Sequence, residues 1–155
     1  MIRRAEIRDI DRIHELLRQV NYVHYLGRPD LFKLGNKYTD EELKEILVDD
    51  LRPIFVYTDE NDTVLGYAFC IYQQILDSNL LTDIRTLYID DLCVDEGRRG
   101  EHIGSDLYRY VIDFAKANDF YNVTLNVWAF NESALRFYEK CGLHKQKIYM
   151  ENILK

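Results

Sequence analysis

The sequence predicts an α/β fold in which a mixed, mostly antiparallel central sheet is flanked by about four helices. In the first half of the chain, closely spaced apolar runs lie between turn residues and predict hairpins. In the second half, apolar runs alternate with stretches whose apolar residues recur at helical spacing. Hairpins followed by strand-helix-strand units are typical of a mixed sheet. The chain shows no internal repeat, low-complexity tract or linker, so we expect a single domain over residues 1–155.

The individual elements follow from the same patterns. Strands are expected where short apolar or alternating runs lie between turn residues, at 2–5, 54–57, 64–75, 81–94, 122–127 and 143–153. Helices are expected where apolar residues are three and four positions apart, at about 8–24, 40–51, 107–117 and 131–140. Thr39 and Glu42 have the spacing of a capping box, which marks the start of the second helix. Gly142 is placed to end the last helix.

Composition and charge argue against several classes of function. A net charge of −7 disfavours a general affinity for nucleic acid, which proteins bind through Lys and Arg. The charged start Met1–Glu6 and the lack of a long apolar run predict no leader and no membrane span, with the cytoplasm as the location. Cys70, Cys93 and Cys141 lack the spacing of metal ligands, so we expect buried free thiols and no metal site.

The strongest functional signal lies in residues 92–105, which join an apolar strand to an amphipathic helix through a loop rich in glycine and arginine. Gly100 and Gly104 allow the backbone to approach a ligand closely, and Arg98 and Arg99 supply positive charge. The helix that follows begins with unpaired N–H groups and the positive end of its dipole. The segment therefore predicts an anion site, for which a pyrophosphate is the natural ligand.

Two common phosphate loops do not fit this segment. A Walker loop needs a Gly-Lys-Ser or Gly-Lys-Thr ending, which is absent, and the glycines lack the G-x-G-x-x-G spacing of dinucleotide-binding folds. The pattern that remains, R-x-x-[G]-x-G from Arg99 to Gly104, resembles the acyl-CoA pyrophosphate loop of the GNAT superfamily of N-acetyltransferases. A second block, Leu125 to Leu143, is similar to the strand, the N-x-x-A helix and the F-Y-x-K-x-G ending of that family.

The resemblance implies a GNAT-like acyl-CoA N-acyltransferase fold over essentially the whole chain. It also implies that acetyl-CoA is the cosubstrate and that its pantetheine arm lies in a gap between the strand before the loop and the strand after the loop's helix. The implied cofactor-binding residues belong to the strand end, the loop and the start of the last helix: Leu92, Cys93, Val94, Arg99, Gly100, Glu101, His102, Ile103, Gly104, Ser105 and Asn131. Asn131 can equally serve as the N-cap of its own helix.

Transfer of an acetyl group to an amine needs a base, because a primary amine with a pKa of ~10.4 is almost fully protonated at pH 7. Asp90 and Asp91 are the candidates, acting directly or through water. Neighbouring strand residues face opposite ways, so the two share one task only if a bulge intervenes. Tyr88 to Val94 is similar to the corresponding strand of spermidine/spermine acetyltransferases, which puts Asp90 ahead of Asp91. An acidic surface patch or an ion pair is the alternative for both residues.

Tyr138 falls in the Phe-Tyr pair that resembles the general-acid position of the family. Its phenol would donate a proton to the departing sulfur, while the N–H of Val94 would polarise the thioester. A packed aromatic residue is the alternative for Tyr138. The loop departs from the family pattern at His102, where glycine is more usual. That departure motivates a second hypothesis, a non-catalytic acyl-CoA-binding sensor or interaction module on the same fold.

The acceptor is expected opposite the cofactor, between the first two helices, their connection and the final strands. Tyr25, Arg28 and Asp30, with Tyr22 and His24 beside them, are candidate substrate contacts. An ordinary surface loop is the alternative interpretation of this cluster. We expect the partner to be a small-molecule or peptide amine and expect no binding to nucleic acid or membrane. Pairing of two chains through the final strands, to give a homodimer, is a further hypothesis.

Overall fold

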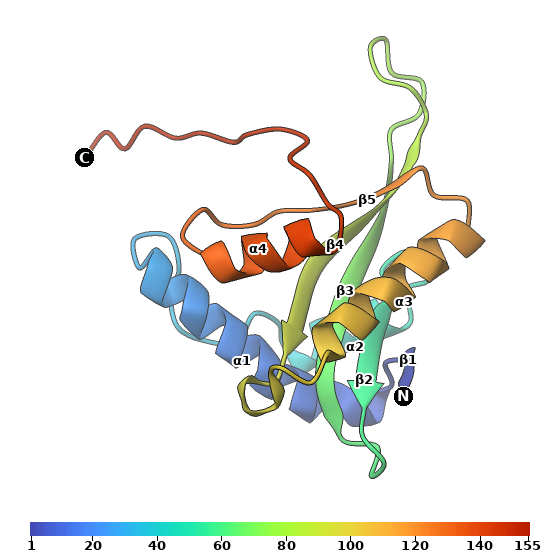
Figure 1. Ribbon diagram of the computed structural model, residues 1–155, viewed down its shortest axis with the longest axis vertical. Coiled ribbons are helices and arrows are strands. Elements are labelled where there is room, and N and C mark those ends of the chain that lie inside the picture. The colour runs from blue at the N-terminus through green and yellow to red at the C-terminus, as the bar shows by residue number, and fades with distance from the viewer.

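The computed structural model describes all 155 residues as one five-stranded sheet with helices on both of its faces (Figure 1). The strands lie across the sheet in chain order: β1 (Ile2–Arg4), β2 (Ile54–Thr58), β3 (Val64–Gln74), β4 (Arg85–Val94) and β5 (Asn122–Leu125). The helices are α1 (Ile10–Gly27), α2 (Asp40–Leu47), α3 (Ile103–Ala117) and α4 (Glu132–Lys140), with short 3-10 helices η1 (Ile7–Asp9) and η2 (Glu96–Arg98). Neighbouring strands pair antiparallel except β4 and β5, which are parallel. The predicted mixed, mostly antiparallel sheet is confirmed.

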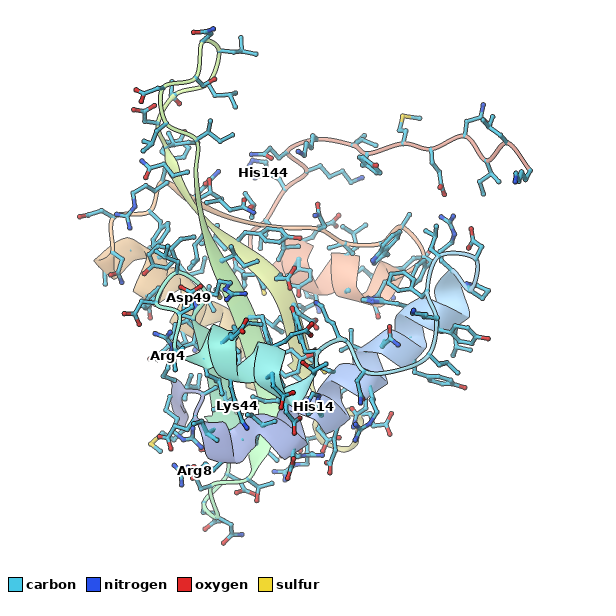
Figure 2. All side chains as sticks on the ribbon, turned by 180° about the vertical axis from the view of Figure 1, so that it is seen from behind. Arg4, Arg8, His14, Lys44, Asp49 and His144 are labelled. Atoms are coloured by element: carbon cyan, nitrogen blue, oxygen red, sulfur yellow. The ribbon has the colours of Figure 1, made fainter.

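Alternation along the strands divides the core between the two faces of the sheet. Val56 and Tyr67 pack on one face with α1 and α2, whereas Phe55 and Ala68, their chain neighbours, pack on the other face with α3. Figure 1 shows α3 lying across the sheet, and Figure 2, drawn from behind, shows α1 and α2 on the opposite face. The residues at the centre of both layers are fully buried, as expected for a core of this size.

The sheet opens between β4 and β5. Their pairing ends at Ile89 and Leu125, whereas β4 continues to Val94 with β3 as its single neighbour. Beyond Leu125 the chain leaves the sheet and runs to the start of α4 (Figure 1). Residues 90–94 therefore have one free backbone edge. This is the gap that the resemblance to acetyltransferases implies.

The predicted final strand is wrong for the single chain. Residues 143–153 form no strand, and the bond from the Leu143 N–H to the Tyr138 carbonyl, 3.1 Å long, is the last backbone hydrogen bond. Figure 1 shows the segment running away from α4 in an extended form, and Figure 2 marks His144 near its start. The apolar residues of this segment have a strand-like pattern, but a strand also needs a neighbour. The pattern alone does not reveal whether the same chain supplies that neighbour.

Other boundaries shift by a few residues. α1 continues to Gly27, and β4 begins at residue 85 instead of 81. α2 ends before residue 51, because the Asp49 carboxylate accepts the N–H of Leu51 at 2.9 Å and turns the chain. The capping box is confirmed, since the Thr39 hydroxyl accepts the N–H of Glu42 at 3.1 Å. None of the helices has the length and apolar composition needed to cross a bilayer.

Candidate functional site

The free edge of β4 presents backbone N–H groups to the gap. Asp95 donates its N–H to the carbonyl of Leu65 on β3, at 2.8 Å. Because N–H groups alternate in direction along a strand, those of Val94 and Leu92 point away from β3. No residue of β5 pairs with this part of β4. A ligand in the gap can therefore hydrogen-bond to the end of the strand.

The loop after β4 is shaped by two residues in the left-handed conformation. Gly100 has φ +85° and His102 has φ +63°. His102 is the N-cap of α3, and its side chain makes no capping hydrogen bond. The N–H groups of the first turn, from Ile103 to Ser105, consequently have no partner in the protein. Left-handed turns and free helix starts both form concave groups of N–H donors that bind anions.

The two arginines of the loop differ in availability. Arg98 is bound to the carboxylate of Glu101 at 2.7 Å, whereas Arg99 is exposed and makes no ion pair. Arg99 is thus the arginine that is free to contact a phosphate. Gly104 marks a close approach between elements, since a Cβ there would lie 3.4 Å from the ring of Phe137 on α4. The start of α3 is therefore packed directly beside the helix that carries Tyr138.

A bulge in β4 brings Asp90 and Asp91 to the same face of the sheet. Consecutive residues of β3 oppose Ile89 and Asp91, so Asp90 is the extra residue and the alternation of side chains is reset. Lys37, from the connection between α1 and α2, places its Nζ 3.1 Å from Oδ2 of Asp90. Burial disfavours the charge of Lys37, but Asp91 and Asp90 together raise its pKa. The two carboxylates and one ammonium form a compact charged group beside the gap.

Asp91 has the more unusual environment of the two aspartates. Its Oδ2 accepts the hydroxyl of Tyr67 at 2.8 Å. Burial raises the pKa of Asp91 to about 6, although Lys37, the Tyr67 hydroxyl and the N–H of Leu92 act in the opposite direction. The carboxyl therefore changes its charge just below neutral pH. A carboxylate of this kind is well matched to accept a proton at pH 7.

Tyr138 lies on α4, close to this carboxyl. Burial and then the negative charge of Asp91 raise the pKa of its phenol above the ordinary value of 10. Weaker effects of the same sign come from Cys141 and Cys93, so the phenol is near the end of β4 as well as near Asp91. The hydroxyl stays protonated at neutral pH and is available as a proton donor.

The cysteines are not activated as nucleophiles. Cys70 and Cys93 are buried, which raises the pKa of each thiol to about 12, whereas Cys141 is half-buried. All three thiols are free, as predicted, and the predicted burial is confirmed for Cys70 and Cys93 but is wrong for Cys141. A thiol with such a pKa is almost wholly protonated at pH 7 and is a poor nucleophile. Asn131, at the start of α4, caps its helix, since its Oδ1 accepts the N–H of Ala134 at 3.3 Å.

The predicted acceptor residues lie at the far end of α1. Arg28 pairs with Asp30 at 2.8 Å and also with Glu151 of the C-terminal segment. Both charges are thus neutralised within the chain, and neither residue contacts the aspartates of β4 in the structure. Tyr25 is half-buried and makes no hydrogen bond through its hydroxyl. The residue of the α1–α2 connection that does contact the aspartates of β4 is Lys37.

An aromatic cluster joins the end of α1 to the chain between β5 and α4. The ring of Phe32 lies 5.1 Å from that of His24 and 5.2 Å from that of Trp128, measured between centroids. Trp128 in turn stacks on Phe130 at 5.9 Å. A Cβ at Gly27 would lie 2.3 Å from the Phe130 ring, so the end of α1 is packed tightly here. The cluster packs the end of α1 against the segment that precedes α4.

Sequence reasoning did not single out Lys37 or Tyr67, which contact the two aspartates. Lys37 is 53 positions away from Asp90 along the chain, and no local pattern connects them. In the sequence, Tyr67 resembles any other strand residue. Its hydrogen bond to Asp91 depends on the register of β3 against β4. The half-buried position of Asp91 depends on the bulge, and no local pattern in the sequence marks that bulge.

The sheet thus opens beside a helix start whose N–H groups have no partner in the chain, and two carboxylates lie next to the opening. The sequence profile of the acetyltransferase (GNAT) family matches residues 12–143, and the chain belongs to this family. The prediction of a GNAT acetyltransferase fold is thereby confirmed. A comparison with curated protein sequences finds no match.

Solved structures extend the likeness to the full chain. A mutant of the BH1408 protein from Bacillus halodurans is 29% identical, with a TM-score of 0.96 over 100% of this chain and 99% of that one. A tetramutant of the same protein is 31% identical, with a TM-score of 0.95 over 99% of both chains. Glucosamine-6-phosphate N-acetyltransferase from Arabidopsis thaliana is 25% identical, with a TM-score of 0.72 over 100% and 98% of the chains.

The first of these superpositions also describes the C-terminal segment. Residues 144–155 are twelve of the 155 residues, and a score of 0.96 over the whole length cannot be reached if they follow a different course. The extended segment is therefore shared with a crystal structure of the Bacillus halodurans protein. An aminoglycoside acetyltransferase from a soil metagenomic sample, in complex with sisomicin, is 22% identical at a TM-score of 0.73 over 100% and 96% of the chains, and it shares the fold.

Proposed function

We propose that this protein transfers the acetyl group of acetyl-CoA directly to an amine. The observation that carries the proposal is the juxtaposition of the free edge of β4, the N–H groups at the start of α3 and the carboxylates at the bulge. Family membership supports an acyltransferase. We propose acetyl-CoA as the cosubstrate and an amine as the acceptor because of the chemistry of the strand edge, the helix N–H groups and the carboxylates.

The residues of the loop fit a coenzyme A diphosphate. Arg99 and the N–H groups from Gly100 to Ser105 would hold it, and the left-handed backbone at residues 100 and 102 directs those groups to one point. Val94 and Leu92 would hydrogen-bond the pantetheine arm. Asn131, whose Oδ1 caps α4, would hold that arm through its side-chain amide group. When bound, acetyl-CoA supplies the activated acyl group.

The aspartates at the bulge would remove the proton of the acceptor. Asp90 already holds one primary ammonium, that of Lys37, at 3.1 Å, so its carboxylate is suited to an incoming protonated amine. We assign the base to Asp90, as the sequence resemblance suggests. Asp91 is the second candidate, because its pKa of about 6 makes it ionised yet basic at pH 7. Variants at the two positions separate these assignments.

Tyr138 would return a proton to the departing sulfur. Its phenol is protonated at neutral pH and lies near the end of β4, where the thioester would be held. The high pKa of the Cys93 thiol argues against a covalent acyl-enzyme at the neighbouring position. The amine would therefore attack the thioester carbon directly, and the thiolate of coenzyme A would leave without an acyl-enzyme being formed.

We infer that the acceptor is a small-molecule amine. Two structures that share the fold are those of enzymes acting on glucosamine-6-phosphate and on aminoglycosides, both small amines. The acidic pair at the bulge favours a cationic group at the reacting end of the acceptor. The alternative of a non-catalytic sensor loses its motive, because His102 adopts the left-handed backbone that a glycine would supply.

The release of free thiol from acetyl-CoA tests the proposal. Purified protein is incubated with acetyl-CoA and a panel of amines that includes polyamines, amino sugars, aminoglycosides, amino acids and peptides. At least one amine is expected to accelerate thiol release, and mass spectrometry should find that amine heavier by one acetyl group. Binding of acetyl-CoA without release for any amine would favour the sensor.

A further inference from the structure

The side chain of Lys37 occupies the place that the proposed function gives to the amine of the acceptor. Its Nζ lies 3.1 Å from Oδ2 of Asp90, the carboxylate assigned as the base. No other lysine of the chain makes an ion pair, and the Lys37 side chain is still 39% exposed, so its amine is not enclosed by protein. The chain thus holds a primary amine of its own at the carboxylate where a substrate amine would bind.

The groups near Lys37 are those that acetyl transfer needs. Burial acts first on the pKa values of Lys37 and Tyr138, and the next influence on both is the negative charge of Asp91, which therefore lies close to both side chains. The N–H of Leu92, the next residue of β4, points into the gap, because it alternates in direction with the N–H of Asp95 that pairs with β3. A base, a proton donor and a hydrogen-bond donor for a carbonyl oxygen are thus gathered at the pair of carboxylates that holds Lys37.

The connection between α1 and α2 fixes the backbone on both sides of Lys37. Before it, the side-chain amide of Asn21 on α1 donates to the carbonyl of Gly35 at 3.3 Å. After it, the ring of Tyr38 stacks on that of Phe69 in β3, with 5.9 Å between the centroids. The contact with the carboxylate therefore belongs to the packing of the connection. An amine held in this way has a high effective concentration at the reacting groups.

We propose that the enzyme acetylates its own Lys37, with acetyl-CoA as the donor. The inference rests on the proposed function, because it uses the same cosubstrate and the same base. Nζ would form a bond with the carbonyl carbon of the acetyl group, and the carbon–sulfur bond would break. Of the two protons that Nζ loses, Asp90 takes one and passes it to water, and the other restores the phenol of Tyr138 after it has protonated the sulfur. The products are an amide on Lys37 and the free thiol of coenzyme A.

Acetylation of Lys37 would change the site for an external acceptor. The amide is neutral, so the ion pair with Asp90 would be lost and the carboxylates would be free of the chain's own ammonium. While Lys37 is unmodified, an external amine has to displace it from the same carboxylate. An added acceptor should therefore slow the self-acetylation by competition.

Mass spectrometry of the full-length protein after incubation with acetyl-CoA, without any amine, tests the proposal. One acetyl group per chain is expected on the peptide that contains Lys37, at a rate per chain that does not depend on protein concentration, because Nζ and Asp90 belong to one chain. Lys37→Arg should stay unmodified, since a guanidinium keeps the charge but not the reactive amine. Lys33→Arg is the matched control, because Lys33 is exposed on the same connection and makes no ion pair. This variant should acquire the acetyl group at the rate of the wild type.

Labelling with trace acetic anhydride, without acetyl-CoA, separates catalysis from chemical reactivity. The ion pair holds the Lys37 amine in its charged, unreactive form, so acetic anhydride should label Lys37 more slowly than Lys33. With acetyl-CoA the order should be reversed. Asp90→Asn should raise the labelling of Lys37 by acetic anhydride and lower its labelling by acetyl-CoA about tenfold or more, because Asp90 protects the amine in the first reaction and serves as the base in the second.

The outcomes distinguish this inference from the proposed function. Acetylation of an added amine, with Lys37 unmodified in the amine-free reaction, would overturn the inference and leave the proposed function standing. No acetylation of either kind by folded protein would overturn both. Acetylation of Lys37 by acetyl-CoA that is no faster than that of Lys33, or that persists unchanged in Asp90→Asn, would also overturn the inference, since chemical reactivity alone would then account for it.

Discussion

At the scale of single residues, the half-buried carboxyl of Asp91 lowers the stability of the fold at neutral pH. Its pKa is raised by burial from 3.8 to about 6, so the folded state holds its proton more tightly than the unfolded state. Stability then falls as pH rises from about 4 to 6, and the loss of about 3 kcal/mol persists above that range. We expect Asp91→Asn to remove this loss.

Urea unfolding at pH 8 and at pH 4 measures the effect. Asp91→Asn should be more stable than the wild type by about 1–3 kcal/mol at pH 8 and nearly unchanged at pH 4. The asparagine oxygen can still accept the hydroxyl of Tyr67, so the hydrogen bond is retained. An equal change in the free energy of unfolding at both values of pH would mean that burial does not disfavour the charged form of Asp91.

Measurements of kcat can also distinguish the roles of Asp90 and Asp91. If Asp90 is the base, Asp90→Asn should reduce kcat by about 10²–10⁴ at pH 7, a typical range for general-base catalysis. Asp91→Asn should then change kcat less, while the limb of the pH profile near pH 6 disappears. The opposite order of kcat values would transfer the assignment to Asp91. The comparison uses the amine identified by thiol release.

Tyr138 is expected to act on the leaving group and not on cofactor affinity. Tyr138→Phe should lower kcat by about 10²-fold or more while the Kd for acetyl-CoA stays within about twofold, because the ring is kept and the proton donor is lost. Tyr121→Phe is the control, since Tyr121 is 73% exposed and lies before β5. Steady-state kinetics and calorimetry give the two quantities. An unchanged kcat would remove Tyr138 from the mechanism.

At the scale of elements, the start of α3 depends on the left-handed backbone at His102. Histidine tolerates this conformation better than most residues, whereas a β-branched residue does not. His102→Gly should therefore keep its affinity for coenzyme A, and His102→Val should lose about tenfold or more, because the N–H groups behind it are displaced. Calorimetric titration compares the two variants. Equal affinity in both would show that this backbone geometry does not shape the anion site.

How far the sequence predicts an element depends on how local its determinants are. The loop from Arg99 to Ser105 and the capping box at Thr39 are defined by residues within one turn of each other, and the expected geometry is present at both places. The charged group of Lys37, Asp90 and Asp91 depends on a bulge and on a contact between distant segments, so local patterns could not predict it. The cofactor and acid-base roles of these residues remain predictions.

The C-terminal segment shows the same limit at the other end of the chain. Residues 143–153 carry the apolar pattern of a strand, but they form no strand in the structure. Hydrogen-bond partners are a property of the surroundings, and the single chain does not supply them.

At the scale of the whole molecule, a buried ion pair connects the N-terminal strand to the first helix. Arg3 holds Asp9 at 2.7 Å, and the carboxylate of Asp9 is 4% exposed. Burial raises the pKa of Asp9, but the bonds from Arg3 and the N–H of Glu6 outweigh it and hold the pKa below 3.8. This contribution to stability is present above pH 3.8 and is lost as pH falls through the lower pKa of the folded state.

Asp9→Asn should consequently destabilise the fold by about 3 kcal/mol at pH 7, because Arg3 is left without its buried partner. The difference from the wild type should shrink as pH falls below about 3.8. Asp50→Asn is the control, since Asp50 is 98% exposed and its contact with Arg4 at 3.6 Å contributes little. Chemical unfolding at pH 7 and near pH 3 measures both variants. A constant difference at the two pH values would argue that packing, and not charge, is responsible.

The claim on which the functional account depends is that the start of α3 binds the diphosphate of coenzyme A. Calorimetric titration of the folded protein with coenzyme A tests it most directly. The account predicts saturable heat at a ratio of one ligand per chain. It also predicts about tenfold weaker binding of coenzyme A for Arg99→Ala. Arg109→Ala is the control and should bind coenzyme A as the wild type does, because Arg109 is 71% exposed and lies further along α3. No heat from well-folded protein with coenzyme A or acetyl-CoA would contradict the account.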